Sequence, residues 1–130
     1  MIYGGLFNSA VKAAEKAYCG YSGFHVGAAL LTADGRIFMG CNIENASYSL
    51  TVCAERTAIF KAVSEGITRF SAIAVAGSAD GDFSRPCVPC GACLQVLSEF
   101  CSGGFPIILA DGAHRLSDFM PAAFGKENLK

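Results

Sequence analysis

Two short motifs place three thiols and one carboxylate at spacings that suit metal chemistry. They are Cys-Ala-Glu at residues 53–55 and Pro-Cys-Gly-Ala-Cys at residues 89–93. Thiolates are good ligands for Zn²⁺, and a catalytic zinc ion has three protein ligands and a fourth position open to water. The three ligands would be Cys53, Cys90 and Cys93, and Glu55 would move protons beside them. The pattern predicts a zinc-dependent hydrolytic enzyme with one Zn²⁺ per subunit and Glu55 as its catalytic residue.

Both motifs are expected at the starts of helices. Thr51 is predicted as the N-cap of one helix and Pro89 as the first residue of another. Cys53 and Cys90 would then lie where the partial positive charge of a helix N-terminus stabilises thiolate over thiol. Because three thiolates and one Zn²⁺ carry a net negative charge, Arg56 is predicted to donate hydrogen bonds to the sulfur ligands.

Two other interpretations of the cysteines stay open on the residues alone. Cys87, Cys90 and Cys93 form a C-x-x-C-x-x-C pattern, so Cys87 would supply the fourth sulfur of a structural site in a non-enzymatic zinc-binding interaction module. The pair Cys90 and Cys93 also suits a thiol oxidoreductase, which would work without metal. Loss of zinc on removal of Cys87 would indicate the first interpretation, and activity without metal would indicate the second.

The composition describes a weakly charged chain. Of its 130 residues, 52% are hydrophobic and 16% are charged, against about 25% charged in ordinary soluble domains. The length predicts a single domain over residues 1–130. The low charge predicts that part of the surface is covered in a homo-oligomer. The net charge of −1, with no basic cluster, weighs against nucleic acid as a partner.

The N-terminal sequence has neither a basic start followed by an apolar run nor a span long enough for a membrane helix. We therefore expect no signal peptide, no membrane partner and a cytoplasmic location. Thiols stay reduced in that compartment. The seven cysteines are accordingly interpreted as metal ligands and small buried residues instead of disulfides.

Helical and strand patterns alternate along the chain, which predicts an α/β fold with helices on both faces of a mixed sheet. Helices are expected from Leu6 to about residues 18–20, from 51 to a stop at Gly66, from 89 to 101, and over 121–124. Strands are expected over 24–31, 36–41, 70–76, 105–110 and 113–117, with a hairpin turn at 33–35.

Four segments in this order resemble the cytidine deaminases of the small homotetrameric, zinc-dependent type. They are the two cysteine motifs, Phe-His-Val-Gly-Ala-Ala-Leu at residues 24–30 and Asn-Ile-Glu-Asn-Ala-Ser-Tyr at residues 42–48. The resemblance implies a three-layer α/β/α fold with a five-stranded sheet. It also implies hydrolytic deamination of cytidine and 2′-deoxycytidine in pyrimidine salvage, a nucleoside substrate, and a homotetramer with shared active sites.

The resemblance also implies roles for single residues. Asn42 and Glu44 would hold the ribose 3′-hydroxyl, Phe24 would pack on the pyrimidine, and the backbone N–H of Ala54 would meet the base carbonyl. Residues from a neighbouring subunit would complete the pocket, namely Ala46, Tyr48 and Phe124. The chain departs from the family at Leu94, where arginine is common. A blasticidin-S deaminase is the near alternative, because it shares the zinc motif but lacks the 42–48 segment.

Overall fold

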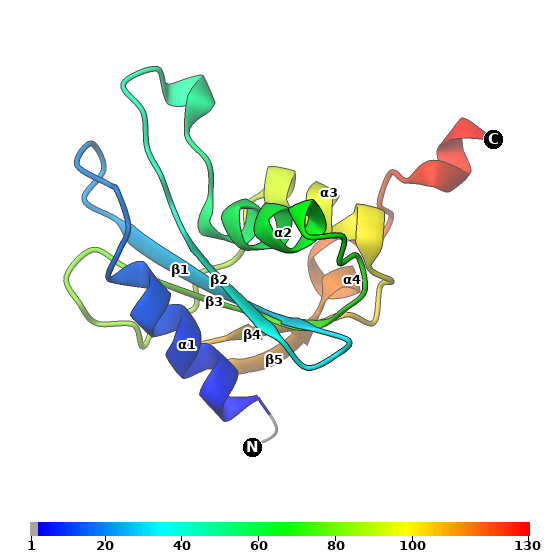
Figure 1. The fold of residues 1–130 in the computed structure, drawn as a ribbon, viewed down its shortest axis with the longest axis horizontal. Coiled ribbons are helices and arrows are strands. Elements are labelled where there is room, and N and C mark those ends of the chain that lie inside the picture. The colour runs from blue at the N-terminus through cyan, green and yellow to red at the C-terminus, as the bar shows by residue number, and fades with distance from the viewer. Residues whose placement is uncertain (1–2) are drawn as a thin grey trace.

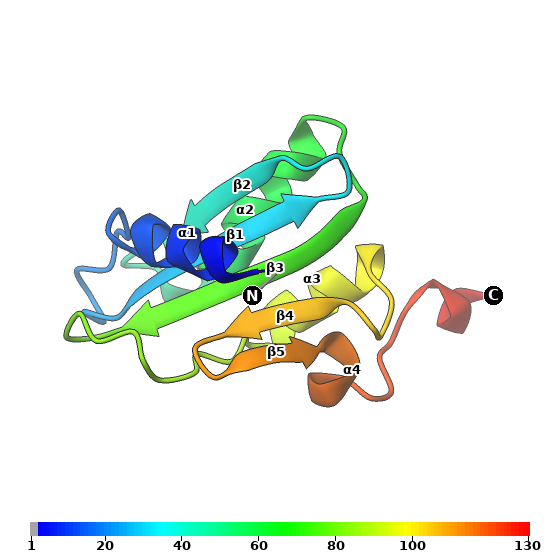
Figure 2. The same cartoon turned by 90° about the horizontal axis from the view of Figure 1, so that it is seen from below.

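The structure is a computed structural model that describes residues 3–130. A mixed five-stranded sheet lies between helix α1 on one face and helices α2 and α3 on the other, which confirms the predicted α/β fold (Figure 1 and Figure 2). The elements in chain order are α1 (Gly4–Ala14), β1 (His25–Thr32), β2 (Ile37–Cys41), α2 (Ala54–Ser64), β3 (Phe70–Ser78), α3 (Gly91–Phe100), β4 (Pro106–Leu109), β5 (Gly112–Arg115) and α4 (Leu116–Phe119), with 3₁₀ turns at Tyr48–Leu50 and Lys126–Leu129.

The strand order β2-β1-β3-β4-β5 brings the two cysteine motifs to the same end of the sheet, where β2 and β3 finish. β1 runs antiparallel to β2 and β3, and its Gly27 pairs with Cys41 on one side and Ala76 on the other. The C-terminal ends of β2 and β3 therefore flank the start of β1 at the same end of the sheet. After β2 the chain continues through a loop into α2, and after β3 it continues into α3. Helix α3 is the crossover that leads to β4, which is parallel to β3. Helices α2 and α3 consequently begin near the same end of the sheet.

Small residues let the three layers pack closely. β3 is buried on both faces from residue 72 to residue 78, as expected for a strand that helices cover on both sides. Its Ile73 and Val75 belong to the core under α2 and α3, whereas Ala72, Ala74 and Ala76 belong to the core under α1. The alternation follows the period of two that places successive side chains of a strand on opposite faces.

The first helix is shorter than the sequence predicts. It ends at Ala14 instead of residues 18–20, because Tyr18 uses its backbone groups elsewhere. The N–H of Tyr18 donates to the carbonyl of Asn42 at 3.0 Å, and its carbonyl accepts from the N–H of Glu44 at 2.8 Å. These bonds form a β-bridge with the segment that leaves β2, which a helical residue 18 could not make.

The predicted starts of α2 and α3 are each two residues too early. Cys53 is the N-cap of α2, because the hydroxyl of Thr51 accepts a hydrogen bond from the N–H of Asn45 at 3.2 Å and serves the preceding loop. Cys90 is the N-cap of α3, one residue after Pro89. Both cysteines thus stand at the last extended residue before a helix, with Cys93 in the first turn of α3.

Gly66 ends α2, as the sequence predicts. Its φ is 87°, and its N–H donates to the carbonyl of Val63 at 2.9 Å. The N–H of Ile67 donates to the carbonyl of Ala62 at 3.0 Å. This pair of bonds is a Schellman motif, in which a glycine adopts the left-handed conformation at little cost.

Two glycines let helices lie directly on strands. A Cβ atom on Gly40 of β2 would lie 2.5 Å from the backbone nitrogen of Ala58 and 2.6 Å from the carbonyl oxygen of Ala54 in α2. A Cβ atom on Gly27 of β1 would lie 1.9 Å from the carbonyl oxygen of Ala10 in α1. Only glycine permits such an approach of two backbones, so the heights of α1 and α2 above the sheet are fixed at these positions.

Two segments project from the layered body, the loop that joins β2 to α2 and the C-terminal segment after α4 (Figure 1). The helix predicted over 121–124 is wrong. Residues 121–124 are irregular, because Pro121 stops α4 and the carbonyl of Phe124 accepts a hydrogen bond from the Gln95 side chain at 2.9 Å. Across residues 3–130, none of the helices is long and apolar enough to cross a lipid bilayer.

Candidate active site

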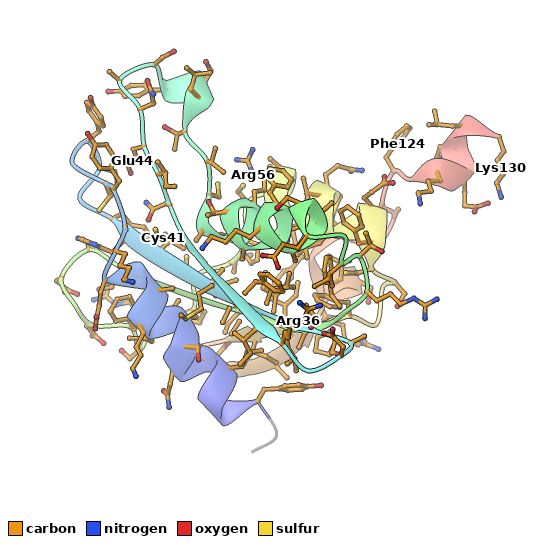
Figure 3. The ribbon with its side chains drawn as sticks, viewed as in Figure 1. Arg36, Cys41, Glu44, Arg56, Phe124 and Lys130 are labelled. Carbon is orange, nitrogen blue, oxygen red and sulfur yellow. The ribbon has the colours of Figure 1, made fainter. Side chains whose placement is uncertain are left out.

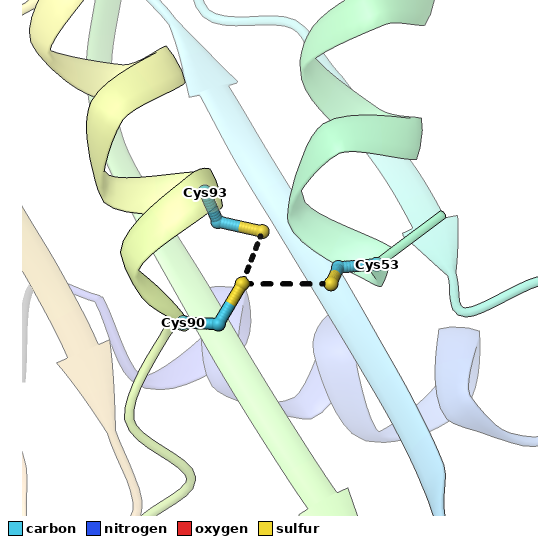
Figure 4. Close-up of side chains that lie close together, drawn as sticks. All are labelled: Cys53, Cys90 and Cys93. Carbon is cyan, nitrogen blue, oxygen red and sulfur yellow. Dashed lines mark hydrogen bonds between the residues drawn. The ribbon is translucent and has the colours of Figure 1, made fainter. Parts of the chain in front are cut away.

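The two cysteine motifs meet where α2 and α3 begin. The sulfur of Cys90 lies 3.7 Å from that of Cys53 and 3.5 Å from that of Cys93 (Figure 4). All three sulfurs lie within 4.8 Å of one another. The fold thus brings together three potential ligands from two segments that are 37 residues apart in sequence.

The electrostatics of the cluster favour a thiolate. The pKa of Cys53 is lowered to about 5, because Cys93 and Arg56 donate hydrogen bonds to its sulfur. Nη2 of Arg56 lies 3.3 Å from this sulfur. The pKa of Cys93 is raised, since it donates to Cys53 and is buried. One of the three sulfurs therefore ionises readily at neutral pH, as metal binding requires of a ligand.

The geometry of the cluster fits zinc. Ligands at the corners of a tetrahedron, each about 2.3 Å from a Zn²⁺ ion, are separated by about 3.8 Å, close to the distances from Cys90 to Cys53 and Cys93. A set of soft sulfur ligands selects zinc over magnesium or calcium. The charge also fits, because the guanidinium of Arg56 would offset the excess negative charge of three thiolates around one Zn²⁺. Nε of Arg56 is buried and has no partner in residues 3–130.

A cavity of about 210 Å³ opens beside the sulfurs. Glu55, in the first turn of α2, lines it and is only 3% exposed. Burial raises the pKa of this carboxyl, so its protonated form is more accessible near neutral pH than for an exposed glutamate. The other lining residues are Val26, Asn42, Thr51, Cys53, Ala54, Cys87, Val88 and Cys90. A carboxyl that can hold a proton thus shares a small, largely apolar space with the sulfur ligands.

Some of the predicted substrate contacts line this cavity, whereas Phe24 and Glu44 lie outside its lining, next to residues that form it. Asn42 and Ala54 line the cavity, and Glu44 adjoins it, with Oε2 lying 3.5 Å from Nδ2 of Asn42. Nδ2 of Asn42 donates to the carbonyl of Phe24 at 2.9 Å, and Oδ1 accepts from the N–H of Val26 at 2.9 Å. The segments 24–26 and 42–44 are therefore held together at the cavity, as a shared binding role would require.

Three predicted residues lie apart from the cavity. Ala46, Tyr48 and Phe124 are absent from its lining within residues 3–130, and all three are exposed, Tyr48 by 77% and Phe124 by 56%. Figure 3 shows Glu44 on the projecting loop and Phe124 on the C-terminal segment at the opposite end of the molecule. Tyr48 instead lies edge to face against Tyr21 and lines, together with Glu44 and Ser22, a separate hollow of about 430 Å³.

Sequence reasoning missed four parts of the site. Val26, Thr51 and Val88 line the cavity but carry no chemical signal in the sequence. The hydroxyl of Ser22 contacts Glu44 and Phe24. Its only available signal was the polar turn that precedes the 24–30 segment.

Cys87 lines the cavity but is separate from the ligand cluster. The metal-ligating group in residues 3–130 consists of Cys53, Cys90 and Cys93. The pKa of Cys87 is raised to about 11, chiefly by burial and also by Glu55, so its thiol stays protonated at neutral pH. Its sulfur would lie 2.6 Å from a Cβ atom on Gly77, which places it against β3. This arrangement does not favour a four-sulfur structural site.

We therefore expect Cys87→Ala to keep its metal. Zinc content, measured by plasma mass spectrometry after gel filtration, should stay at about one ion per chain, because the three ligating sulfurs are unchanged. A Cys87→Ser variant is the control for loss of side-chain volume. Loss of zinc from both variants would instead support the four-sulfur interaction module.

The sequence of residues 4–108 matches the protein-family model of the cytidine and deoxycytidylate deaminase zinc-binding region. A cytidine deaminase of Sporosarcina psychrophila is 51% identical over 91% of this chain and 88% of its own length. A blasticidin-S deaminase of Bacillus cereus is 38% identical, over 68% of this chain and 66% of its own length.

Solved structures agree with the sequence comparisons. A cytidine deaminase of Burkholderia pseudomallei matches with a TM-score of 0.85 and 45% identity, over 95% of this chain and 100% of its own. A cytidine deaminase of Mycobacterium tuberculosis matches with a TM-score of 0.85 and 41% identity, over 96% of this chain and 98% of its own. Together with the three-sulfur cluster and the buried Glu55, these matches show that the chain belongs to the zinc-binding cytidine and deoxycytidylate deaminase family.

Proposed function

We propose that this protein hydrolyses cytidine and 2′-deoxycytidine to uridine and 2′-deoxyuridine, with release of ammonia, as a step of pyrimidine salvage. One observation carries the proposal, the buried carboxyl of Glu55 in a small cavity beside three sulfurs that suit zinc. Cys53, Cys90 and Cys93 would hold one Zn²⁺ per subunit. When bound, the ion lowers the pKa of a water molecule toward about 7 and so supplies a nucleophile at neutral pH.

Glu55 is the proton carrier in this proposal. Its carboxylate takes a proton from the attacking water and gives it to N3 of the cytosine ring, which makes C4 more electrophilic. It then takes the proton of the hydroxyl group that has been added at C4 and delivers it to the amino group, which leaves as ammonia as the C4 carbonyl forms. Burial suits the carboxyl to both steps, because a raised pKa brings its protonated and ionised forms closer in free energy near neutral pH.

Asn42 and Glu44 would recognise the sugar. Their facing atoms, Nδ2 and Oε2, lie 3.5 Å apart, so a ribose 3′-hydroxyl can accept from the first and donate to the second. Phe24, whose backbone carbonyl is bonded to Asn42, would pack on the pyrimidine, and the N–H of Ala54 would meet the base carbonyl. A phosphate at the 3′ position would leave this hydroxyl unavailable, which favours a free nucleoside over a polynucleotide.

The working enzyme would be a cytoplasmic homotetramer of single-domain chains with shared active sites. Support comes from the two projecting segments, because they expose large apolar side chains that a single chain leaves uncovered, Tyr48 and Leu50 on the loop and Phe124 on the C-terminal segment. Ala46 and Tyr48 would contact a neighbouring chain from one segment and Phe124 from the other. Each substrate would then be enclosed by more than one subunit.

A substrate panel tests the proposed function directly. The purified protein is given cytidine, 2′-deoxycytidine, cytosine or blasticidin S, and deamination is followed by ultraviolet absorbance and by release of ammonia. We expect turnover of the two nucleosides, abolished by a zinc chelator and restored by Zn²⁺. Turnover of blasticidin S alone would assign the chain to that substrate, and activity without metal would indicate thiol chemistry at Cys90 and Cys93.

A further inference from the structure

One hydroxyl outside the cavity lining contacts two of the proposed substrate-binding residues. Oγ of Ser22 donates a hydrogen bond to Oε2 of Glu44 and accepts one from the N–H of Phe24 at 3.0 Å. Gly23 lies between Ser22 and Phe24 in the chain, and its φ of 70° forms the turn that directs the N–H of Phe24 back to Ser22. Glu44 and Phe24 come from different segments, so Ser22 connects them.

Ser22 fixes the orientation of the Glu44 carboxylate. The N–H groups of Tyr21 and Ser22 donate to Oε1 at 3.2 and 3.0 Å, and the Ser22 hydroxyl holds Oε2. With both oxygens held, the carboxylate has one orientation, and it presents Oε2 toward Nδ2 of Asn42. These hydrogen bonds, the one from the Ser22 side chain first among them, also lower the pKa of Glu44, which keeps the group an acceptor at neutral pH.

The same hydroxyl fixes the backbone of Phe24. The N–H of Phe24 donates to Ser22, and its carbonyl accepts from Asn42 at 2.9 Å. Its ring lies against β3, since Cε2 is 3.0 Å from the position of a Cβ atom on Gly77. The residue is thus held at both backbone groups and along its ring, and the Ser22 bond is one of the two backbone attachments.

We infer that Ser22 is a positioning residue that couples sugar recognition to base packing, by setting the Glu44 carboxylate and the Phe24 backbone through one hydroxyl. The inference rests on the proposed function, because it takes Glu44 as the group that meets the 3′-hydroxyl and Phe24 as the group that meets the base. Ser22 is exposed, so its hydroxyl adds little to the core. Its side-chain partners are both residues of the proposed site.

The test compares cytidine with 3′-deoxycytidine, which differs from it only in lacking the 3′-hydroxyl. In Ser22→Ala we expect KM for cytidine to rise roughly tenfold, the size typical of a lost hydrogen bond to a charged group, with kcat changed by less than about threefold. The preference for cytidine over 3′-deoxycytidine, as a ratio of kcat/KM values, should fall at least about fivefold. Ser22→Thr, which keeps the hydroxyl, should restore both quantities to within about twofold of the unmodified protein.

Ser22→Cys is a second variant that weakens the hydrogen bond while it keeps nearly the same side-chain shape. Because a thiol is a weak donor, this variant should lose part of the preference for cytidine. Ser9→Ala, in which the lost hydroxyl bonds only to a carbonyl within α1, is the matched control and should leave the ratio unchanged. Uridine binding by calorimetry provides a readout independent of turnover. If the preference is unchanged in both Ser22→Ala and Ser22→Cys, or is not restored in Ser22→Thr, the inference about Ser22 is refuted and the proposed function is not. Absence of cytidine turnover in the unmodified protein would refute the proposed function and this inference with it.

Discussion

Glu55→Gln should lose nearly all turnover of cytidine while it keeps its zinc and its fold. General acid and base catalysis contributes about 10²–10⁴-fold, and we expect kcat to fall by at least that much because the amide cannot carry the proton. Glutamine has the shape of the neutral acid, and burial already favours the neutral form of Glu55. Metal content by plasma mass spectrometry and the melting temperature should therefore stay close to those of the unmodified protein.

The control for this variant is Glu65→Gln. Glu65 is the C-cap residue of the same helix and is exposed, so its charge has no role at the cavity. It should keep full activity. If Glu55→Gln keeps normal kcat with cytidine, the proton transfers assigned to Glu55 must be carried by another group, and the proposed role would be wrong.

Cys53→Ala should lose both zinc and activity. Two sulfurs would remain, and the variant would also lose the thiolate whose pKa is lowered to about 5 by hydrogen bonds from Cys93 and Arg56. A two-sulfur site is far weaker than a three-sulfur one. We expect zinc content below about one tenth of an ion per chain after dialysis, with cytidine turnover below detection. Added Zn²⁺ should not restore it.

Cys101→Ala is the matched control for removal of a thiol. Burial raises the pKa of Cys101 to about 12, and the residue follows the C-terminal end of α3, at the opposite end of this helix from the cluster. It should keep one zinc ion per chain and its activity. Full zinc content in Cys53→Ala would mean that the ion binds elsewhere, and it would contradict the assignment of the ligands.

Local patterns were enough to predict the fold, because its elements follow from short-range chemistry. The hairpin turn at residues 33–35 and the Gly66 stop were recognisable from single residues whose conformational preferences are strong. Errors occurred where contacts made only in the folded chain override local preference. Tyr18 leaves α1 early because it pairs with the loop after β2, and Thr51 is no N-cap because it binds Asn45. The partners of Tyr18, which are Asn42 and Glu44, lie outside a short sequence window, whereas Asn45 is near Thr51 in sequence but reaches it only in the folded loop.

The site divides in the same way. The spacing of the cysteines carries its own chemistry, so the sequence predicts that they meet, and the structure brings their sulfurs together. The role of Ser22 depends on a contact with Glu44 across 22 positions of sequence and could not be predicted from residue types. Whether Ala46, Tyr48 and Phe124 complete a site depends on neighbouring chains, which no pattern within one chain determines.

The glycine at position 40 makes the distance between α2 and the sheet a property of the main chain. Any other residue at position 40 would lift the first turns of α2, and with them Cys53 and Glu55, away from the sheet. Evolution can therefore exchange many of the alanines and valines of the core for neighbours of similar volume while the ligands keep their spacing. A side chain at position 40 has no such room, so glycine there preserves the geometry of the site without contacting any reactant.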